Sequence, residues 1–458
     1  MKPLLAIAIV LSAVVTAGAQ DAPASPPAPS LSLARPDPPA GAPLVITLAD
    51  ALQRAKQNEP AFLSAAADAA IARDDRVQAR AAMLPAFSAT TQYIGNQESP
   101  ALRTGRFVSM DGPSMYRAWL VAKQDVSTAT FTGAPLRKAQ ASEAAALAKL
   151  EIAQRGLVVT VTRDYYAFVA AQRKYATAQL AAQQAQRFFD IAQQQERLGQ
   201  VARADVVKAE ISARQQRQAF DETALAMSNA RLALAVILFP AFNENFSIVD
   251  DLQSAPVLPP FADVRTMDEH ENPDLRAAGE LLRAAAEDLR LSRSALLPSL
   301  TIEADYGIEA NEFALHSRVA ADPELGVLPN LGYAVSVNLS VSLWDWGGLR
   351  SKVRQSQTRQ RLAQATLSQA QRQLVSNLYS MYNEALTARA AVDGLRRVAE
   401  LAAESLRLTT LRYQAGESTA LEMVDAQNTA VQTRNAADDA EARYRVAIAE
   451  LQTLTGSF

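Results

Sequence analysis

The 458-residue chain contains no cysteine, only two histidines and no strong excess of either charge, its formal net charge being −3. The absence of cysteine excludes disulfides, thiol catalysis and cysteine metal ligands, and we expect no cysteine-linked lipid anchor. His270 and His316 belong to different expected elements, so each is interpreted as a solvated or capping side chain. The weak net charge creates no basic field, and we therefore expect no nucleic-acid partner.

The chain also lacks the motifs that mark catalytic or cofactor sites. It has no nucleophile elbow, no phosphate-binding loop and no residues with metal-ligand spacing. Its carboxylates are scattered along helix-forming segments, and Glu287, for example, is interpreted as an ordinary surface charge. We predict that the protein is not an enzyme, and we expect no catalytic, cofactor-binding or metal site and no cofactor.

A long apolar run occurs only at the N-terminus. Lys2 precedes the apolar stretch 4–15, whose length of about 12 residues falls short of the roughly 20 that span a bilayer. A cleavage signal of small residues follows at 17–19, with Gln20 as the expected first mature residue. The pattern predicts a signal peptide at 1–19 and therefore an exported protein. We expect no transmembrane helix in the remainder.

A segment rich in proline and alanine follows at 20–43, and this composition favours an extended tether over a packed core. Ordered structure is expected from residue 44 onward, where Thr47 is a suitable helix N-cap.

The remaining chain repeats itself, at a spacing that drifts from 213 residues (Pro60 to Pro273) to 217 (Asp205 to Glu422). Other matching pairs are Leu84-Pro85 and Leu297-Pro298, Tyr93 and Tyr306, Val126-Ser127 and Val341-Ser342, Gly133 and Gly348, and Leu198-Gly199 and Ala415-Gly416. The repeat predicts two structural halves, 44–240 and 263–458, joined by a proline-containing linker at 241–262.

Each half is expected to contain a helix, two short strands and then a very long helical region. No proline lies between Pro135 and Pro240 or after Pro329, and both stretches are rich in helix-forming residues. A helix over about 137–197 would be roughly 90 Å long at 1.5 Å per residue. Because a globular core needs no such helix, this length predicts an elongated coiled-coil structure.

Alternation of apolar and polar residues predicts the strands. They are expected at about 85–95, 118–128, 298–308 and 332–344. The fourth segment alternates strictly, and its predicted lipid-facing residues are Val335, Val337, Leu339 and Val341. The segment 118–128 alternates poorly and is placed by the symmetry of the repeat. Strands of about 9–11 residues with one apolar face fit a membrane barrel, although a half-buried sheet in a soluble protein would also alternate.

The number of strands has a consequence for assembly. Four strands cannot close a barrel around an open lumen, and an open sheet edge is not stable in lipid. If the strands lie in a membrane, other copies of the chain must complete the sheet. The strands therefore predict a homo-oligomer but not its number.

Several motifs carry a family resemblance. Leu84-Pro85 and Leu297-Pro298 form expected helix-to-strand corners, residues 343–350 (LWDWGGLR) form a strand-to-helix exit, and 198–206 and 412–426 form helical hairpin turns. In this order and in duplicate, they resemble the TolC-like outer-membrane efflux proteins over residues 44–458. The first half departs from the pattern at 131–134, where it lacks the double glycine of the second half.

The resemblance implies a fold that is mainly α with membrane β-structure, built on a duplicated helix–strand–strand–long-helix repeat. It implies a homotrimer whose twelve strands form a barrel in the outer membrane of a Gram-negative bacterium. A long α-helical, coiled-coil barrel would continue into the periplasm. The implied function is that of a passive channel, the exit duct of a tripartite efflux or secretion system. The implied partners are further copies of the chain, a periplasmic adaptor protein, an inner-membrane pump and outer-membrane lipid.

The resemblance also places the turns at Gly199 and Gly416 at the periplasmic tip. The predicted tip or gate residues are Asp205, Glu422, Asp425, Arg203 and Arg412. Three copies would arrange the carboxylates in rings that favour cations, and the arginines are expected to pair with them and hold a closed state. The alternative is that the carboxylates are exposed hairpin charges with a capping role.

Two other classes of protein remain open. A soluble periplasmic coiled-coil scaffold would explain the helices without channel activity and would need no detergent. A periplasmic enzyme with a helical domain would need an active site, for which no residues are found. A wide polar duct would pass drugs, metal ions, siderophores or proteins alike, so chemical selection is expected in the pump.

Overall fold

A computed structural model describes residues 43–95, 114–241, 243, 245–254, 256–265, 272–316 and 329–455. The predicted signal peptide, almost all of the predicted tether and His270 lie outside these residues. The elements in chain order are β1 Leu44–Ile46, α2 Leu48–Asn58, α3 Pro60–Ala81, β2 Ala86–Gly95, β3 Ser114–Ser127, α4 Thr128–Thr132, α5 Ala134–Arg197, α6 Arg203–Leu238, β4 Phe246–Ile248, the 3₁₀ helix η1 Leu252–Ser254, α7 Phe261–Arg265, α8 Pro273–Ser294, β5 Ser299–Ala310, β6 Leu331–Ser340, α9 Gly348–Gln414 and α10 Ala420–Thr455.

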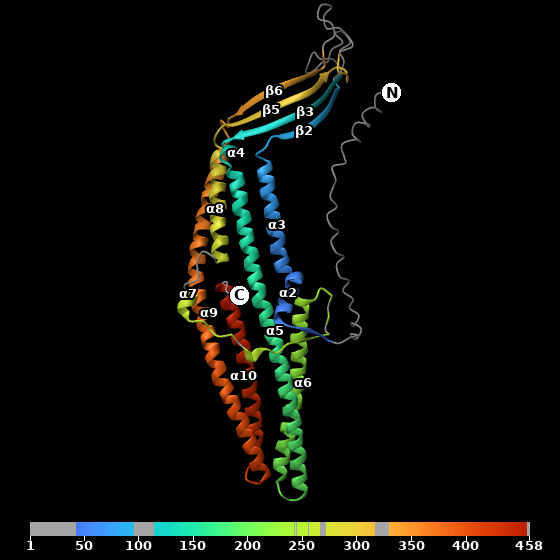
Figure 1. Ribbon diagram of the computed structural model, residues 1–458, viewed down its shortest axis with the longest axis vertical. Helices are drawn as coiled ribbons and strands as arrows, with labels where there is room; N and C mark the ends of the chain where they lie inside the picture. The colour runs from blue at the N-terminus through green and yellow to red at the C-terminus, as the bar shows by residue number, and fades with distance from the viewer. Residues whose placement is uncertain are drawn as a thin grey trace, which may run out of the picture.

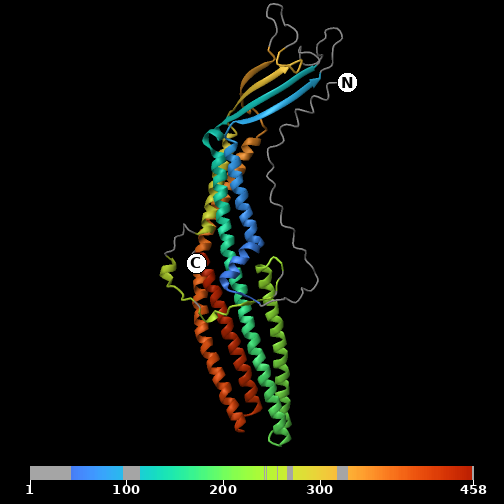
Figure 2. The same cartoon turned by 45° about the vertical axis from the view of Figure 1, so that its right-hand side comes forward.

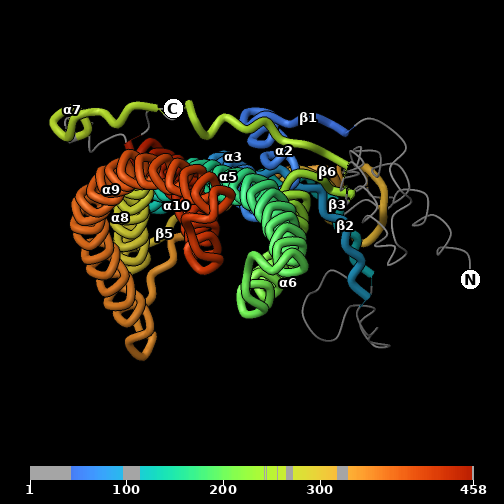
Figure 3. Tube along the Cα trace, turned by 90° about the horizontal axis from the view of Figure 1, so that it is seen from below, coloured from blue at the N-terminus to red at the C-terminus, as the bar shows by residue number. Residues whose placement is uncertain are grey.

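The molecule is strongly elongated, with four strands at one end and helices running away from them (Figure 1). Helices α5 and α9 have 64 and 67 residues, which corresponds to about 96 and 100 Å. Seen along the long axis, α9, α10, α5 and α6 stand side by side in a curved row (Figure 3). Among the described residues, no helix combines the length and the apolar character needed to cross a membrane.

The four strands at this end of the molecule form one antiparallel sheet in the order β2-β3-β5-β6. Strands β2 and β6 are its two edges, and among the described residues each has a ladder partner on one side only. The predicted fold class, mainly helical with a β-part and a duplicated plan, is confirmed, while the sheet of a single chain is open (Figure 2).

The duplication is visible in matched helix lengths and caps. Helices α3 and α8 have 22 residues each, and α6 and α10 have 36 each. Glu59 caps α3 and Asn272 caps α8, each by accepting a hydrogen bond from the first turn, and each is followed by a proline at the first helical position. Thr47 forms a capping box with Asp50 at the start of α2, which confirms its predicted N-cap role.

The predicted linker 241–262 contributes to the core near the middle of the molecule. Its strand β4 pairs in parallel with β1, and Phe246 packs on Phe168 of α5 with ring centroids 5.9 Å apart. The buried Tyr165 hydroxyl donates a hydrogen bond to the Val249 carbonyl at 2.7 Å. The segment is therefore held against the long helix, which its proline content did not indicate.

Two strand boundaries differ from the predicted ones by four residues, and the others differ by at most two. Strand β6 ends at Ser340 because its ladder partner β5 begins opposite, at Ser299, so residues 341–344 have no partner strand. Strand β3 begins at Ser114, four residues before the predicted start, because β2 extends to Gly95 and pairs with it. Both corrections follow from cross-strand register, which a single segment does not reveal.

Candidate functional site

One face of the sheet is apolar across all four strands. The register places Ile302 opposite Val337, Tyr306 opposite Tyr333, and Leu120 opposite Tyr306, so these side chains share one face. Val337 is 62% exposed and Tyr333 is 82% exposed, because no other element of the described chain covers this face. Of the predicted lipid-facing residues, Val335, Val337 and Leu339 lie on β6, and Val341 follows its end.

The opposite face is polar and internally paired. Arg117 of β3 forms an ion pair with Glu309 of β5 at 2.7 Å and lies over the Trp119 ring. Thr301 donates a hydrogen bond to Asp125 at 2.9 Å. The register also explains why β3 alternates poorly in the sequence, because Trp119 and Val121 lie on its polar face and Gln124 lies on its apolar face. A sheet with one apolar and one polar face can separate lipid from water.

The segment between β6 and α9 is shaped by Asp345. Its carboxylate accepts hydrogen bonds from the backbone amides of Gly347 at 3.0 Å and Leu349 at 2.6 Å, which caps α9. Gly347 has φ +83, as Gly133 before α5 has φ +64, so Gly347 and not Gly348 is the structural counterpart of Gly133. Trp344, 75% exposed, lies just after the apolar strand, a position typical of residues at a membrane interface.

At the other end of the molecule, two hairpin turns form the tip, defined as residues 198–205 and 415–425. Gly199 ends α5 with φ +71 and Gly416 ends α9 with φ +80, a conformation that favours glycine. The following amides of Gln200 and Glu417 each close a six-residue turn onto a helix carbonyl, at 2.9 and 2.8 Å. The two turns therefore have the same backbone design.

The predicted tip carboxylates occupy similar helical positions. Asp205 is half-buried in the first turn of α6, and Glu422 is exposed in the first turn of α10. Both positions favour acidic residues because the helix dipole is positive there. Glu422 also accepts a hydrogen bond from Ser418 at 2.7 Å, whereas Asp425 is exposed one turn further along.

The arginines predicted to pair with these carboxylates bind elsewhere within this chain. Arg203 lies 3.3 Å from Glu196, and Arg412 donates a hydrogen bond to the Glu417 carbonyl at 3.2 Å. Arg203 and Asp205 are two positions apart on one helix, so their side chains do not face each other. The predicted pairing is therefore not formed within the described chain.

Tyr413 links the two hairpins at the tip and was not singled out from the sequence. Its ring packs edge to face on Phe188 of α5 at 4.9 Å, and its hydroxyl lies 3.2 Å from the Gln195 side chain. Burial, followed by the negative charge of Asp205, raises the pKa of Tyr413. The alignment of Leu198-Gly199 with Ala415-Gly416 places Tyr413 near this turn and could have indicated it.

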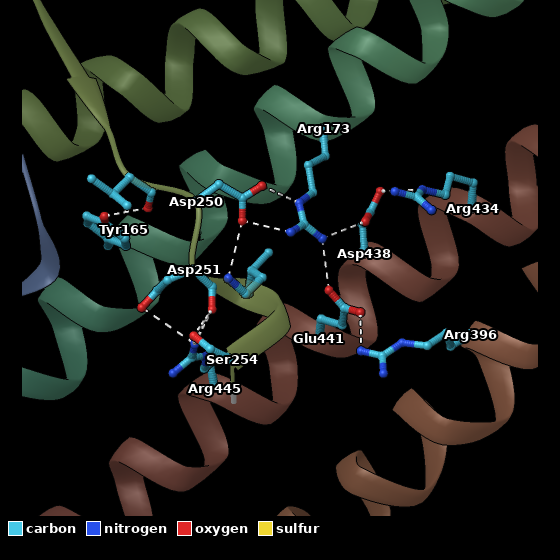
Figure 4. Close-up of polar contacts among 12 residues, drawn as sticks. Tyr165, Arg173, Asp250, Asp251, Ser254, Arg396, Arg434, Asp438, Glu441 and Arg445 are labelled. Carbon is cyan, nitrogen blue, oxygen red and sulfur yellow. Dashed lines mark hydrogen bonds and ion pairs between the residues drawn. The ribbon is translucent and has the colours of Figure 1, made fainter. Parts of the chain in front are cut away.

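A buried cluster of charges joins the two repeats above the tip (Figure 4). Arg173 of α5 contacts Asp250 at 2.6 Å, Glu441 at 2.8 Å and Asp438 at 3.1 Å. Arg396 of α9 adds a contact to Glu441 at 2.7 Å. Burial raises the pKa of Asp438, whereas Arg173 holds the pKa of Asp250 below its usual range.

The described residues contain no group of three or more His, Cys, Asp or Glu side chains placed to hold a metal ion. His316 forms an isolated backbone bridge with Pro329 near the strand end of the molecule. The described part of the chain thus consists of a sheet with one apolar and one polar face, a set of long helices and a tip. The charges of the Arg173 cluster form ion pairs with one another.

Comparison with known proteins agrees with this architecture. Nodulation protein T of Rhizobium leguminosarum bv. trifolii is 26% identical over 299 residues, which cover 63% of this chain and 60% of that relative. The outer membrane protein TolC of Vibrio cholerae is 22% identical over 90% of both chains. The Campylobacter jejuni CmeC outer membrane channel has the same fold, with a TM-score of 0.76, 16% identity, and coverage of 89% of this chain and 85% of that one.

A family model described as outer membrane efflux protein matches residues 51–238 and 268–457, one segment in each repeat. The matched segments cover most of the chain and confirm the predicted family, the outer-membrane location and the prediction that the chain is not an enzyme. The protein belongs to the outer membrane efflux protein family.

Proposed function

We propose that the protein is the exit duct of a tripartite efflux or secretion system, in which copies of the chain form a passive outer-membrane channel. The observation that carries this proposal is the sheet, which is apolar on one face, polar on the other, and open along β2 and β6. Backbone groups at an open edge need hydrogen-bond partners in lipid. Pairing of β6 with β2 of a further copy supplies them.

Three is the smallest number of copies that leaves a lumen. Two copies would form eight strands, and a barrel of that size is narrow enough to be filled by its own side chains. Three copies form twelve strands, with the face that carries Arg117 and Glu309 toward water. Helices α5 and α9 then extend the wall by about 100 Å into the periplasm.

The tip is the proposed gate and the proposed contact with a periplasmic adaptor protein, which would connect the duct to an inner-membrane pump. Three-fold symmetry repeats Asp205, Glu422 and Asp425 around the axis. Closely spaced carboxylates favour cations and require counterions or arginines from a neighbouring copy. Family membership and the exposed position of Glu422 and Asp425 support this role.

Fractionation followed by planar-bilayer recording tests the function. The protein is expected in the outer-membrane fraction, and the purified protein is expected to produce discrete single-channel steps. A protein that is recovered in soluble form without detergent and produces no conductance would contradict the proposal. That result would support a soluble coiled-coil scaffold.

A further inference from the structure

Two helices beside the sheet are the free edges of a row. Helix α3 packs on α5, α5 on α8, and α8 on α9, so α3 and α9 stand at opposite ends of this row (Figure 1). Helix α3 leads directly into the edge strand β2, and α9 follows the edge strand β6. Pairing β6 with β2 of a second copy therefore brings α9 beside α3 of that copy.

The free side of α9 is basic. No acidic residue lies between Asp345 and Glu384, a stretch that contains Arg350, Lys352, Arg354, Arg359, Arg361 and Arg372. Ser356 is buried and contacts Ser292 of α8, which identifies the inner side of α9. Arg354 and Arg361 lie two and five residues from Ser356, roughly 140–160° around the helix. Both are exposed, and neither forms an ion pair within the described chain.

The free side of α3 is acidic. Arg76 forms an ion pair with Glu143 of α5 at 3.1 Å, and Ala69 is buried, which together identify the inner side of α3. Asp74 lies five residues after Ala69 and two before Arg76, again roughly 140–160° around the helix. It is exposed, as are Asp68 and Asp75, and none of the three forms an ion pair with a described residue.

Asp74 and Arg354 lie at similar depths along their helices, counted from the helix ends next to the sheet. Asp74 is seven residues before the end of α3 at Ala81, and Arg354 is six residues after the start of α9 at Gly348. At 1.5 Å per residue, these positions are about 10 and 9 Å below the helix ends next to the sheet. Packed helices lie about 8–10 Å apart, a gap that arginine and aspartate side chains together can bridge.

We propose that α9 of one protomer and α3 of the next form an electrostatic seam below the membrane, with Arg354 opposite Asp74 and Arg361 deeper along the same side. The occupant of each edge is a second copy of this chain. Two α9 edges repel each other, so the seam favours the head-to-tail contact that closes a ring. This inference rests on the proposed channel and identifies the charged residues that direct the contact between its protomers.

Cross-linking tests the seam, and the absence of native cysteine makes every engineered thiol unique. The full-length Asp74→Cys/Arg354→Cys protein in detergent is expected to give covalent dimers and trimers with a short bis-maleimide. The matched control, Asp74→Cys/Arg372→Cys, separates the thiols by about 26 Å along the axis and should stay monomeric on a denaturing gel. A trimer by mass with no cross-link at 74–354 would contradict the seam but not the channel. A monomer by mass would contradict the channel itself.

A charge exchange provides an independent test. Asp74→Arg or Arg354→Asp alone places like charges opposite each other, and each is expected to reduce several-fold the fraction of trimer that survives mild heating. The Asp74→Arg/Arg354→Asp double variant should restore that fraction to the wild-type value. Trimers equally resistant in all four proteins, or a double variant weaker than both single variants, would overturn the proposal.

Discussion

The Arg173 guanidinium lies 3.1 Å from Asp438, although 265 positions separate the two residues along the chain. Arg173 belongs to the first repeat and Asp438 to the second, and both side chains are largely buried. The contact therefore joins the two halves of the duplicated chain at the level where the linker segment also approaches, through Asp250.

Replacing Arg173 by Met is expected to destabilise the protein. Asp438 and Glu441 would remain buried without their shared partner and would keep only Arg434 and Arg396, so the loss should approach but not exceed the cost of about 3–5 kcal/mol for a buried charge left unpaired. Thermal unfolding followed by circular dichroism measures the effect. Arg163→Ala is the matched control, because Arg163 is 58% exposed in its ion pair with Glu450 and such pairs contribute about 0–1 kcal/mol. Equal stability of the two variants would contradict a structural role for the buried cluster.

Because the pKa of Asp250 is lowered, the stability that this residue contributes depends on pH in a direction that can be predicted. Since the folded-state pKa lies below the ordinary 3.8, the contribution of Asp250 to stability is present above pH 3.8. It is lost as the pH falls through the lowered value. Asp250→Asn should therefore be less stable than wild type at pH 6, and the difference should shrink below about pH 4. A stability difference that stays constant from pH 6 to pH 2.5 would contradict a stabilising role for the ionised Asp250 side chain.

The orientation of β6 can be tested at two adjacent residues. Val337→Arg places a charge on the apolar face and should cost about 2–4 kcal/mol if that face meets lipid near the midplane. The expected result is poor assembly in the outer membrane, measured by the heat-resistant oligomer on a gel. Asn338→Arg changes the neighbouring residue on the polar face and should assemble normally with altered conductance. Similar assembly of both variants would mean that the apolar face does not contact lipid.

The local design of the chain is largely predictable from the sequence. Strict alternation predicts β6, Thr47 predicts the start of α2, and the positions of Gly199 and Gly416 in the repeat agree with the observed helix ends. These features depend on a few neighbouring residues, whose backbone preferences are strong.

The long-range contacts are less predictable. The pairing of β1 with β4, the Arg173 cluster and the packing of Tyr413 on Phe188 join residues far apart in sequence. Glu287, interpreted as a surface charge, is only 6% exposed and forms ion pairs with Arg137 and Arg290. Nothing in its own helix reveals this burial, because the partner Arg137 lies on α5.

The role of the tip carboxylates is tested by Asp425→Ala. If three copies of Asp425 approach the axis, the variant should lose cation selectivity and block by multivalent cations in planar-bilayer recordings. Glu422→Ala should act in the same direction if its side chain also points inward. Asp221→Ala is the control, because its side chain is 62% exposed on α6, far from the tip turns. Unchanged selectivity and block in Asp425→Ala would show that these carboxylates are ordinary hairpin charges.

The most direct test of the central claim is the mass of the purified protein in mild detergent. Mass photometry or light scattering corrected for detergent should give three times the mass of the mature chain, because three copies are the fewest that close the sheet around a lumen. The trimer should dissociate only under denaturing conditions. A monodisperse monomer that is stable without detergent would contradict the account.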